Sequence, residues 1–469
     1  MRELASSRAW SGSRSLRRAA YAVAAVCTLV AACAVDHSDP YGNARSNGRD
    51  PEIPFVQTAV LNGAPILFSP TPRGFGISVT LLAGNPESIG ARVRRADTPV
   101  NGPIHLADAL APDLAEMTIG DLEPGTRYEY EVVEHAPNGE AVLATGSVVT
   151  ARPAGESFSF ALISDSHIGP DLTYSNQGDE NVLKQVAAAV DTVRPDFMVN
   201  LGDMLDYHQY GFNAPPPDGS ISRKAYLNYR TWLGEMTART PHFPVIGNWE
   251  GENGEFSPEA IAWSREQRML YMPAPGPGTY PEGGSPYNDY YAFTWGDALF
   301  VVLNVMTYTP TAHLLSSNPG LPDDWTLGPE QLAWLTQTLE NATSKWRFLM
   351  IHHAVGGAAG DAANSAYGRG GGQAAHVGEQ ALVHQLMLDH GVQVFFYGHD
   401  HVFTDMTVDG IHYTAPGSAG APWMFTQAET GYEQSWLESG WGRVDVTPES
   451  LHVEFISING ELLYEYTLP

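Results

Sequence analysis

The sequence predicts a protein of mixed α/β class (α+β), in which a small antiparallel β-sandwich over residues 52–153 precedes a larger α/β domain over residues 154–469. Before about residue 150, short runs alternate apolar and polar residues and are broken by turn residues, as is typical of antiparallel strands. From residue 158 onward, buried-strand runs alternate with helical stretches, which is typical of an α/β domain with a substantial sheet. The length of 469 residues is enough for two or three domains with sizeable cores.

Two segments carry the period-two pattern of the β-sandwich most clearly. Gly76–Leu82 is expected to form one strand and Arg127–Val133 another. The turn residues of Leu122–Thr126 stand directly before the second strand. A region of about 100 residues with this pattern has the size of a β-sandwich domain.

In the α/β domain, strands and helices are predicted in alternation. The strands are expected at Phe158–Ile163, Asp196–Leu201, His242–Ile246, Leu299–Leu303, Trp346–Ile351 and Val392–Tyr397. The helices are expected at Asp179–Val193, Ser222–Ala238, Gly328–Asn341 and Val377–Asp389. The final segment, Trp441–Leu468, returns to alternation, so closing antiparallel strands are expected there. Two long irregular stretches, Tyr207–Gly219 and Ala354–Gln373, are either surface loops or loops that shape a substrate site.

The first 33 residues are expected to form a signal peptide. Several arginines precede the apolar run Ala19–Ala32, which is too short to span a bilayer as a helix but has the length of a signal-peptide core. The run ends in small residues before Cys33, which resembles a bacterial lipobox, so we expect Cys33 to be lipidated. The alternative is an ordinary signal peptide cut nearby. In either case the protein is expected to be exported, and residues 34–51 read as a flexible spacer.

Composition excludes several classes of function. Asp and Glu total 53 against 25 Lys and Arg, a formal charge of −28, which argues against nucleic-acid binding. The only cysteines are Cys27 and Cys33, so the mature domains have no disulfide and no thiolate for metal binding or catalysis. No other apolar run has the length of a transmembrane helix, so the only membrane contact expected is the lipid at Cys33.

Five of the predicted strands run directly into residues that can ligate metals. The five segments are Asp165-Ser166-His167, Gly202-Asp203, Gly247-Asn248, His352-His353 and Gly398-His399-Asp400-His401. Open α/β sheets place their ligand sites at the carboxyl ends of strands, so these side chains are expected to converge. They supply enough oxygen and nitrogen donors for two metal ions that share one carboxylate. Imidazole, carboxylate and amide donors without sulfur suit Fe, Mn, Zn or Co.

The order of these segments resembles that of the calcineurin-like metallophosphoesterases over residues 158–420. The resemblance implies an αββα sandwich for the catalytic domain and two metal ions, which Asp203 would bridge. It implies that Asp165, His167 and His401 hold one ion, and that Asn248, His352 and His399 hold the other. His352 is chosen over His353 because the family's His-x-Pro segment places the ligand first, although Ala354 replaces that proline here.

The domain layout is also similar to that of the purple acid phosphatases, which carry a fibronectin-like β-sandwich before the catalytic domain. Their metal-binding tyrosine would fall at Asp206, so the residue that makes them purple is missing. His167 instead supplies the ligand that the non-purple members use. The resemblance therefore implies a colourless dimetal phosphoesterase. Asp206 and Asp400 are candidates to orient the histidine ligands, or are simply solvated.

Trp249 departs from the family pattern, which has His at this position. An indole can neither give up a proton in catalysis nor act as a base. His353 and His208 are candidates to take over the proton transfer, although each is equally compatible with a supporting or surface role. Trp249 itself is interpreted as a residue that stacks on a base or on an apolar leaving group.

These observations together predict hydrolysis of phosphate esters by a hydroxide that bridges two metal ions. An exported phosphomonoesterase acting on a phosphorylated small molecule is favoured. The first alternative is a phosphodiesterase acting on nucleotides, glycerophosphodiesters or lipid headgroups, to which Trp249 adds some weight. The second is a non-catalytic surface binding protein whose site has decayed, which the seven filled ligand positions disfavour.

Overall fold

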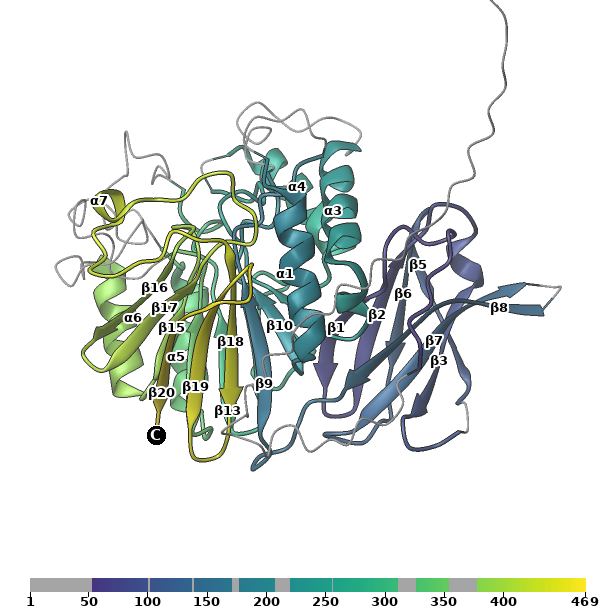
Figure 1. Ribbon diagram of the computed structural model, residues 1–469, viewed down its shortest axis with the longest axis horizontal. Coiled ribbons are helices and arrows are strands. Elements are labelled where there is room, and N and C mark those ends of the chain that lie inside the picture. Colours follow the sequence, from purple (N-terminus) through teal and green to yellow (C-terminus); the bar gives the residue numbers. More distant parts are fainter. Residues whose placement is uncertain are drawn as a thin grey trace, which may run out of the picture. The chain divides into compact units, whose positions relative to one another are not determined.

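The structure is a computed structural model that describes residues 53–99, 102–136, 139–170, 177–206, 220–254, 256–310, 326–353 and 378–469. The expected signal peptide, Cys33 and the spacer lie outside the described residues, as do His208 and the two long irregular stretches. Figure 1 shows a β-rich N-terminal region followed by strands and helices in alternation, which confirms the predicted fold class. None of the described helices is both long and apolar enough to cross a membrane.

The N-terminal region is a sandwich of two antiparallel arrangements of strands around its own apolar core. One layer has the strand order β4-β3-β7-β8 and the other the order β1-β2-β6-β5. Their bounds are β1 Ile66–Thr71, β2 Gly74–Thr80, β3 Ile89–Arg95, β4 Ile104–Leu106, β5 Asp108–Ala111, β6 Leu114–Ile119, β7 Arg127–Ala136 and β8 Gly139–Val149. A short 3-10 helix, η1 (Pro86–Ser88), precedes β3. The core contains Leu67, Ile77, Met117, Tyr130 and Val148, all buried. The period-two segments of the sequence correspond to β2 and β7.

The α/β domain contains two sheets that pack face to face. Its part of the first sheet comprises β9 (Phe158–Ile163), β10 (Phe197–Asn200), β11 (His242–Pro244), β18 (Gly440–Val446), β19 (Leu451–Ser457) and β20 (Leu462–Leu468). The second sheet comprises β12 (Tyr291–Trp295), β13 (Ala298–Val302), β14 (Trp346–Met350), β15 (Val394–Phe396), β16 (Phe403–Val408) and β17 (Ile411–Pro416). Phenylalanines fill the space between the sheets. The Phe160 ring stacks on Phe197 at 5.2 Å and meets Phe300 edge-on at 5.2 Å, so aromatic contacts join the two layers.

Helices cover the outer face of each sheet, which completes the αββα arrangement (Figure 1). Apolar residues of α1 (Glu180–Val193), α3 (Ser220–Leu233) and α4 (Pro258–Tyr271) pack on the first sheet, and α3 leads into η2 (Gly234–Ala238). Residues of α5 (Pro329–Glu340) and α6 (Gly378–Asp389) pack on the second, and a short α7 (Gln427–Thr430) follows β17.

The helix α4 was not predicted from the sequence. Its start carries ordinary signals, because the Ser257 side chain accepts a hydrogen bond from the Ala260 N–H and Pro258 occupies the first turn. Its inner face, however, carries the charged Arg268, which is fully buried beside Glu252 with 2.5 Å between Nε and Oε1. A buried arginine interrupts the apolar periodicity by which an amphipathic helix is found in a sequence.

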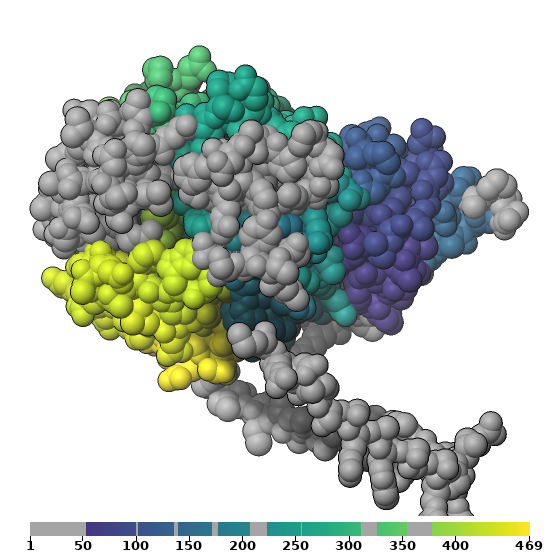
Figure 2. Space-filling view, turned by 90° about the horizontal axis from the view of Figure 1, so that it is seen from above, coloured from purple at the N-terminus to yellow at the C-terminus, as the bar shows by residue number. Residues whose placement is uncertain are grey.

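The sandwich shares a sheet with the α/β domain. The strand order β20-β19-β18-β9-β10-β11-β1-β2-β6-β5 runs without a break, and β1 pairs in parallel with β11 at Phe68 and His242. The space-filling view shows the purple and blue sandwich directly against the teal part of the next domain (Figure 2). Pairing with β1 satisfies backbone groups of β11 that would otherwise form an open sheet edge.

Side chains add further bonds across this junction. The buried Arg230 of α3 donates to the Ser78 carbonyl of β2 at 2.9 Å. The Tyr130 hydroxyl of β7 donates to the Ala238 carbonyl at 2.9 Å. The Tyr280 hydroxyl donates to the Pro70 carbonyl of β1 at 2.7 Å. The two domains are therefore joined by main-chain pairing and by buried polar contacts.

The junction residue His242 is expected to make the fold sensitive to acid. Burial, with a smaller contribution from the nearby Arg230, lowers the pKa of His242 from 6.5 to about 3. Between these two values the unfolded chain binds a proton at this imidazole and the folded protein does not. The free energy of unfolding therefore falls as the pH is lowered through that window.

The measurement is denaturant unfolding of the metal-free wild type and of His242→Leu at about pH 7 and about pH 4. The variant should lose less stability between the two pH values than the wild type, by on the order of 3 kcal/mol, because leucine does not titrate. Equal losses in both proteins would contradict the prediction. The comparison uses only the difference between pH values, so a general destabilisation by the substitution does not affect it.

Candidate metal centre

Each candidate ligand follows a strand and lies buried at its carboxyl end. Asp165 and His167 follow β9, Asp203 follows β10, and Asn248 follows β11, all in the first sheet. His352 and His353 follow β14, and His399 and His401 follow β15, in the second sheet. The side chains of all eight residues are at most 5% exposed. The two sheets thus bring their strand ends to one site.

The backbone at these strand ends adopts conformations that are rare for residues with side chains. Of the ten non-glycine residues with positive φ in the described part of the chain, five are candidate ligands: Asp165, His167, Asp203, His399 and His401. Each such residue costs free energy that the surrounding structure must offset. The strain is consistent with side chains that are held at fixed positions for a function.

The first cluster contains Asp165, His167, Asp203 and His401, whose donor atoms all lie within 4.8 Å of one another. The two imidazole Nε2 atoms of His167 and His401 are 3.1 Å apart. The Nε2 of His401 lies 3.4 Å from Oδ1 of Asp165, and the Nε2 of His167 lies 3.7 Å from Oδ2 of Asp203. The three ligands that the resemblance assigns to one ion are therefore neighbours, together with the expected bridging residue.

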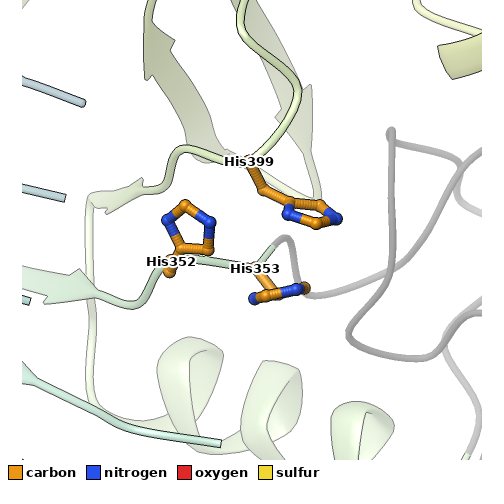
Figure 3. Close-up of side chains that lie close together, drawn as sticks. All are labelled: His352, His353 and His399. Carbon is orange, nitrogen blue, oxygen red and sulfur yellow. The ribbon is translucent and has the colours of Figure 1, made fainter. Parts of the chain in front are cut away.

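The second cluster contains His352, His353 and His399, which Figure 3 shows with their rings gathered from two chain segments. The rings of His353 and His399 are 3.9 Å apart between centroids, and those of His352 and His353 are 4.9 Å apart. His352 also reaches the first cluster, because its Nε2 lies 3.0 Å from Oδ2 of Asp203. The structure thus places His353, the candidate for proton transfer, directly beside the second candidate metal position.

Asn248 directly precedes Trp249, a residue that contacts Asp203. The backbone N–H of Trp249 donates to Oδ1 of Asp203 at 2.8 Å. The Oδ1 of Asn248 is buried and has no hydrogen-bond partner within the described residues. A buried amide oxygen without a partner is costly, and a metal ion at this position would satisfy it.

Backbone carbonyls orient two of the imidazoles. The Nδ1 of His352 lies 2.7 Å from the Leu201 carbonyl oxygen, and the Nδ1 of His401 lies 2.8 Å from that of Trp423. A carbonyl only accepts, so both Nδ1 atoms carry the proton and both Nε2 atoms of the neutral rings keep a lone pair. The lone pair of His352 faces Oδ2 of Asp203, and the lone pair of His401 faces Nε2 of His167. A proton or a metal ion is needed between the two atoms of each pair. The donor set therefore fits metal ions.

Asp206 and Asp400, which were considered as partners for the histidines, have other surroundings. The Asp400 carboxylate accepts a hydrogen bond from the Tyr432 hydroxyl at 2.5 Å. Both carboxyl oxygens of Asp206 are buried without a hydrogen-bond partner among the described residues. Burial, and then the charge of Asp203, raise the pKa of Asp206 to about 7. Neither residue is solvated, and the carbonyls of Leu201 and Trp423 orient the rings instead.

The buried carboxylates draw positive charge into the site. Burial by itself would raise the pKa of Asp165, but the neighbouring His401, His352 and His167 lower it to about 2. Burial by itself would lower the pKa of His352, but Asp203 and Asp165 raise it to about 9. In the absence of metal ions the site therefore takes up protons, which compete with metal ions for the same donor atoms.

Glu250 has a role that the sequence analysis did not assign. Its buried carboxylate accepts hydrogen bonds from four backbone N–H groups, those of Gly247 and Met204 at 2.6 Å, Asp203 at 3.2 Å and Leu205 at 3.3 Å. The carboxylate thereby ties the segment after β11 to the segment after β10. It fixes the backbone on either side of Asp203 and Asn248. The only signal in the sequence was its place two residues after Asn248.

The absence of a side chain at Gly398 allows the strand ends of the two sheets to come into contact. A Cβ atom at this position would lie 2.1 Å from Oγ of Ser164 and 2.9 Å from Oδ2 of Asp165. The backbone N–H of the next residue, His399, donates to both carboxylate oxygens of Asp165 at 3.1 Å. Only glycine allows the two strand ends to approach this closely.

Comparison with known proteins agrees with this geometry. The sequence model of the calcineurin-like phosphoesterase family matches residues 158–403, which is more than half of the chain. No curated protein sequence matches the chain.

Two solved structures resemble the fold over most of its length. Purple acid phosphatase PPD1 from seeds of yellow lupin (Lupinus luteus) is 13% identical, with a TM-score of 0.62 over 86% of this chain and 73% of that one. PhoD is 16% identical, with a TM-score of 0.62 over 87% of this chain and 88% of that one. At these identities the likeness concerns the fold, including the β-rich N-terminal region. Because the family model covers more than half of the chain and every candidate ligand, the chain belongs to the calcineurin-like phosphoesterase family, hydrolases that act on phosphoric esters.

Proposed function

We propose that the chain is an exported phosphomonoesterase that hydrolyses small phosphorylated molecules at a centre of two metal ions. One observation carries the proposal. The carboxylate of Asp203, a member of the first cluster, also reaches the second, with Oδ2 at 3.7 Å from Nε2 of His167 and 3.0 Å from Nε2 of His352. A single carboxylate within reach of two sets of donors is the arrangement that a pair of bridged metal ions requires.

In this proposal each cluster holds one ion. Asp165, His167 and His401 hold the first, Asn248, His352 and His399 hold the second, and Asp203 bridges them. Nitrogen and oxygen donors without sulfur suit Fe, Mn or Zn. When bound, the ions would supply positive charge for the phosphoryl oxygens and would make a water molecule easier to deprotonate.

The residues of the chain supply position and proton transfer. Glu250 and the strained strand ends hold the donors, and the carbonyls of Leu201 and Trp423 keep the imidazoles turned toward the site. His353, whose ring centroid lies 3.9 Å from that of His399, is the proposed donor of the proton that the leaving-group oxygen takes up as its bond to phosphorus breaks. Trp249 cannot perform this transfer, although it occupies the position of the family's histidine.

A second candidate function is hydrolysis of phosphodiesters. Trp249, partly exposed beside His167, favours a substrate with a larger group on the phosphorus atom. The proposed cellular location outside the cytoplasm rests on the arginines and the apolar run before Cys33, with the lipid anchor and the simple secreted form as the two possibilities.

Metal-dependent turnover tests the proposed function. The protein lacking residues 1–33, loaded with Mn²⁺ or Zn²⁺, should hydrolyse p-nitrophenyl phosphate faster than bis-p-nitrophenyl phosphate. Asp203→Asn should lower kcat by about 10³-fold, because loss of the bridging charge removes several kcal/mol of transition-state stabilisation. Faster turnover of the diester would favour the second candidate, and no metal-dependent turnover of either ester would contradict both.

Glu250→Gln should weaken metal binding without loss of the fold. The amide keeps one oxygen that accepts, but its NH2 group faces two of the four backbone N–H groups that now donate to Glu250, so the anchor between the segments around Asp203 and Asn248 is weakened. The affinity for the metal ions, measured by competition with a coloured chelator, should fall about 10- to 100-fold.

Glu379→Gln is the matched control for this variant. The Glu379 carboxylate also accepts a backbone N–H, that of Leu327 at 2.6 Å, together with the Thr326 hydroxyl at 2.9 Å. It is not among the residues of either cluster, so its loss should leave the metal affinity near that of the wild type. Equal losses of affinity in the two variants would contradict a specific role for Glu250.

Replacement of His353 separates proton transfer from metal binding. His353→Ala should retain both metal ions and lose about 10²-fold in kcat on alkyl phosphates, with a smaller loss on aryl phosphates, whose leaving groups need less protonation. His352→Ala should lose one metal ion per chain. Elemental analysis and the two classes of ester provide the measurement. Loss of a metal ion from His353→Ala would identify His353 as a ligand.

A further inference from the structure

Three aromatic side chains, here called the aromatic patch, gather on one side of the first cluster: Trp249, Trp423 and Phe425. The Trp249 ring lies 4.9 Å from the His167 ring, and the Trp423 ring lies 5.3 Å from it. The two indoles are 5.8 Å apart. The rings of Trp423 and Phe425 lie 5.2 Å and 5.4 Å from that of His401. All three patch residues are partly exposed, whereas the imidazoles that they contact are buried.

The patch is held firmly relative to the donor atoms. The segment that carries Trp423 is bonded to the strand end that carries Asp165, because the Ala421 N–H and the Ser418 hydroxyl both donate to the Asp165 carbonyl at 2.9 Å. The Trp423 carbonyl in turn accepts from His401. Trp249 is fixed through its N–H on Asp203. A rigid aromatic surface loses little conformational entropy when a ligand binds to it.

The two clusters differ in what surrounds them. The second cluster includes the imidazole of His353, which can exchange a proton. The first has the aromatic patch, which offers apolar faces to whatever is attached to a phosphoryl group at the donor atoms. The formal charge of −28 makes the chain a poor partner for a further anionic group on the substrate, so an uncharged attachment is favoured.

We propose that Trp249, Trp423 and Phe425 form a binding surface for a flat aromatic group attached to the phosphoryl group of the substrate. The substrate class is therefore an aryl or nucleoside phosphate and not a phosphate of a small polyol. The proposal rests on the proposed function, because it assumes that the phosphoryl group binds at the two clusters. Trp423 and Phe425 extend the site to a segment beyond the strand-end motifs.

A different role for the patch is to shield the histidines from water. An apolar shell around a metal site affects its affinity for the ion, and in that case the rings need not touch the substrate. The two roles predict different results. A shielding patch affects metal binding, whereas a binding surface affects the preference between ligands that differ only in an aromatic ring.

Binding of two phosphonates to the metal-loaded protein tests the proposal without turnover. Phenylphosphonate and methylphosphonate carry the same anionic head group, and only the first has a ring. In calorimetry the wild type should bind phenylphosphonate about 10-fold more tightly than methylphosphonate, as expected for stacking on an aromatic side chain. Trp423→Leu and Trp249→Leu should each reduce this preference to about 2-fold, and Trp423→Phe should retain most of it.

The matched control is Trp334→Leu. Trp334 is a partly buried tryptophan of α5 that packs on Tyr290 and donates to the Glu282 carbonyl, outside both clusters. It should keep the 10-fold preference of the wild type. Metal content is measured for every variant, so that preferences are compared at equal loading.

The outcomes distinguish the two proposals. Equal affinities for the two phosphonates in the wild type, or a preference that survives both leucine variants, would overturn the aromatic binding surface and leave the phosphoesterase function intact. Loss of metal from the leucine variants with an unchanged preference at full loading would assign the patch to shielding. Failure of both phosphonates to bind would contradict phosphoryl binding at the clusters and, with it, the proposed function.

Discussion

The buried negative charge at the strand ends is the constraint on which the rest of the site depends. Asp165, Asp203 and Glu250 lie within a few residues of sheet termini and are essentially inaccessible to water. Burial raises the pKa of Asp203 and raises that of Glu250 to about 8, so these groups stay ionised only where cations and oriented donors offset the burial. The four N–H groups on Glu250 and the two that His399 and Trp249 direct at Asp165 and Asp203 meet part of this need. The imidazoles and the ions that they fit meet the remainder, which explains why the backbone tolerates left-handed conformations there.

Much of the fold could be predicted because its signals are local. Short apolar runs and the capping residue Asp179 predict the alternation of β9, α1 and β10. Helix α4 escaped prediction because the buried Arg268, paired with Glu252, takes the place of an apolar residue on its inner face. The pairing of β1 with β11 also could not be predicted, because it joins Phe68 to His242 across more than 170 residues and has no local pattern.

The candidate ligands could be found because the chain presents them in a fixed order after successive strands. Their supporting residues could not be found in this way. Glu250 acts through backbone groups, which every residue possesses, so no residue type elsewhere in the sequence indicates its partners. Trp423 comes near His167 only because its segment is bonded to Asp165. Contacts of this kind depend on the folded arrangement, and the sequence shows no characteristic spacing between the residues that make them. His208 and the long stretches near residues 210 and 360 lie outside the described residues and remain predictions.

The continuous sheet has a consequence for how this protein can be divided. A boundary near residue 153 looks like a natural place to separate a module, since β8 ends at Val149 and β9 begins at Phe158. A cut there would leave β11 with an unpaired edge, and Arg230 would lose the hydrogen bond to the carbonyl of Ser78. Two halves made in this way would tend to recombine or to associate with other exposed strands. The sandwich and the catalytic domain are therefore expected to unfold together. If the N-terminal region were exchanged between relatives, the incoming β1 would have to pair with β11 of the recipient.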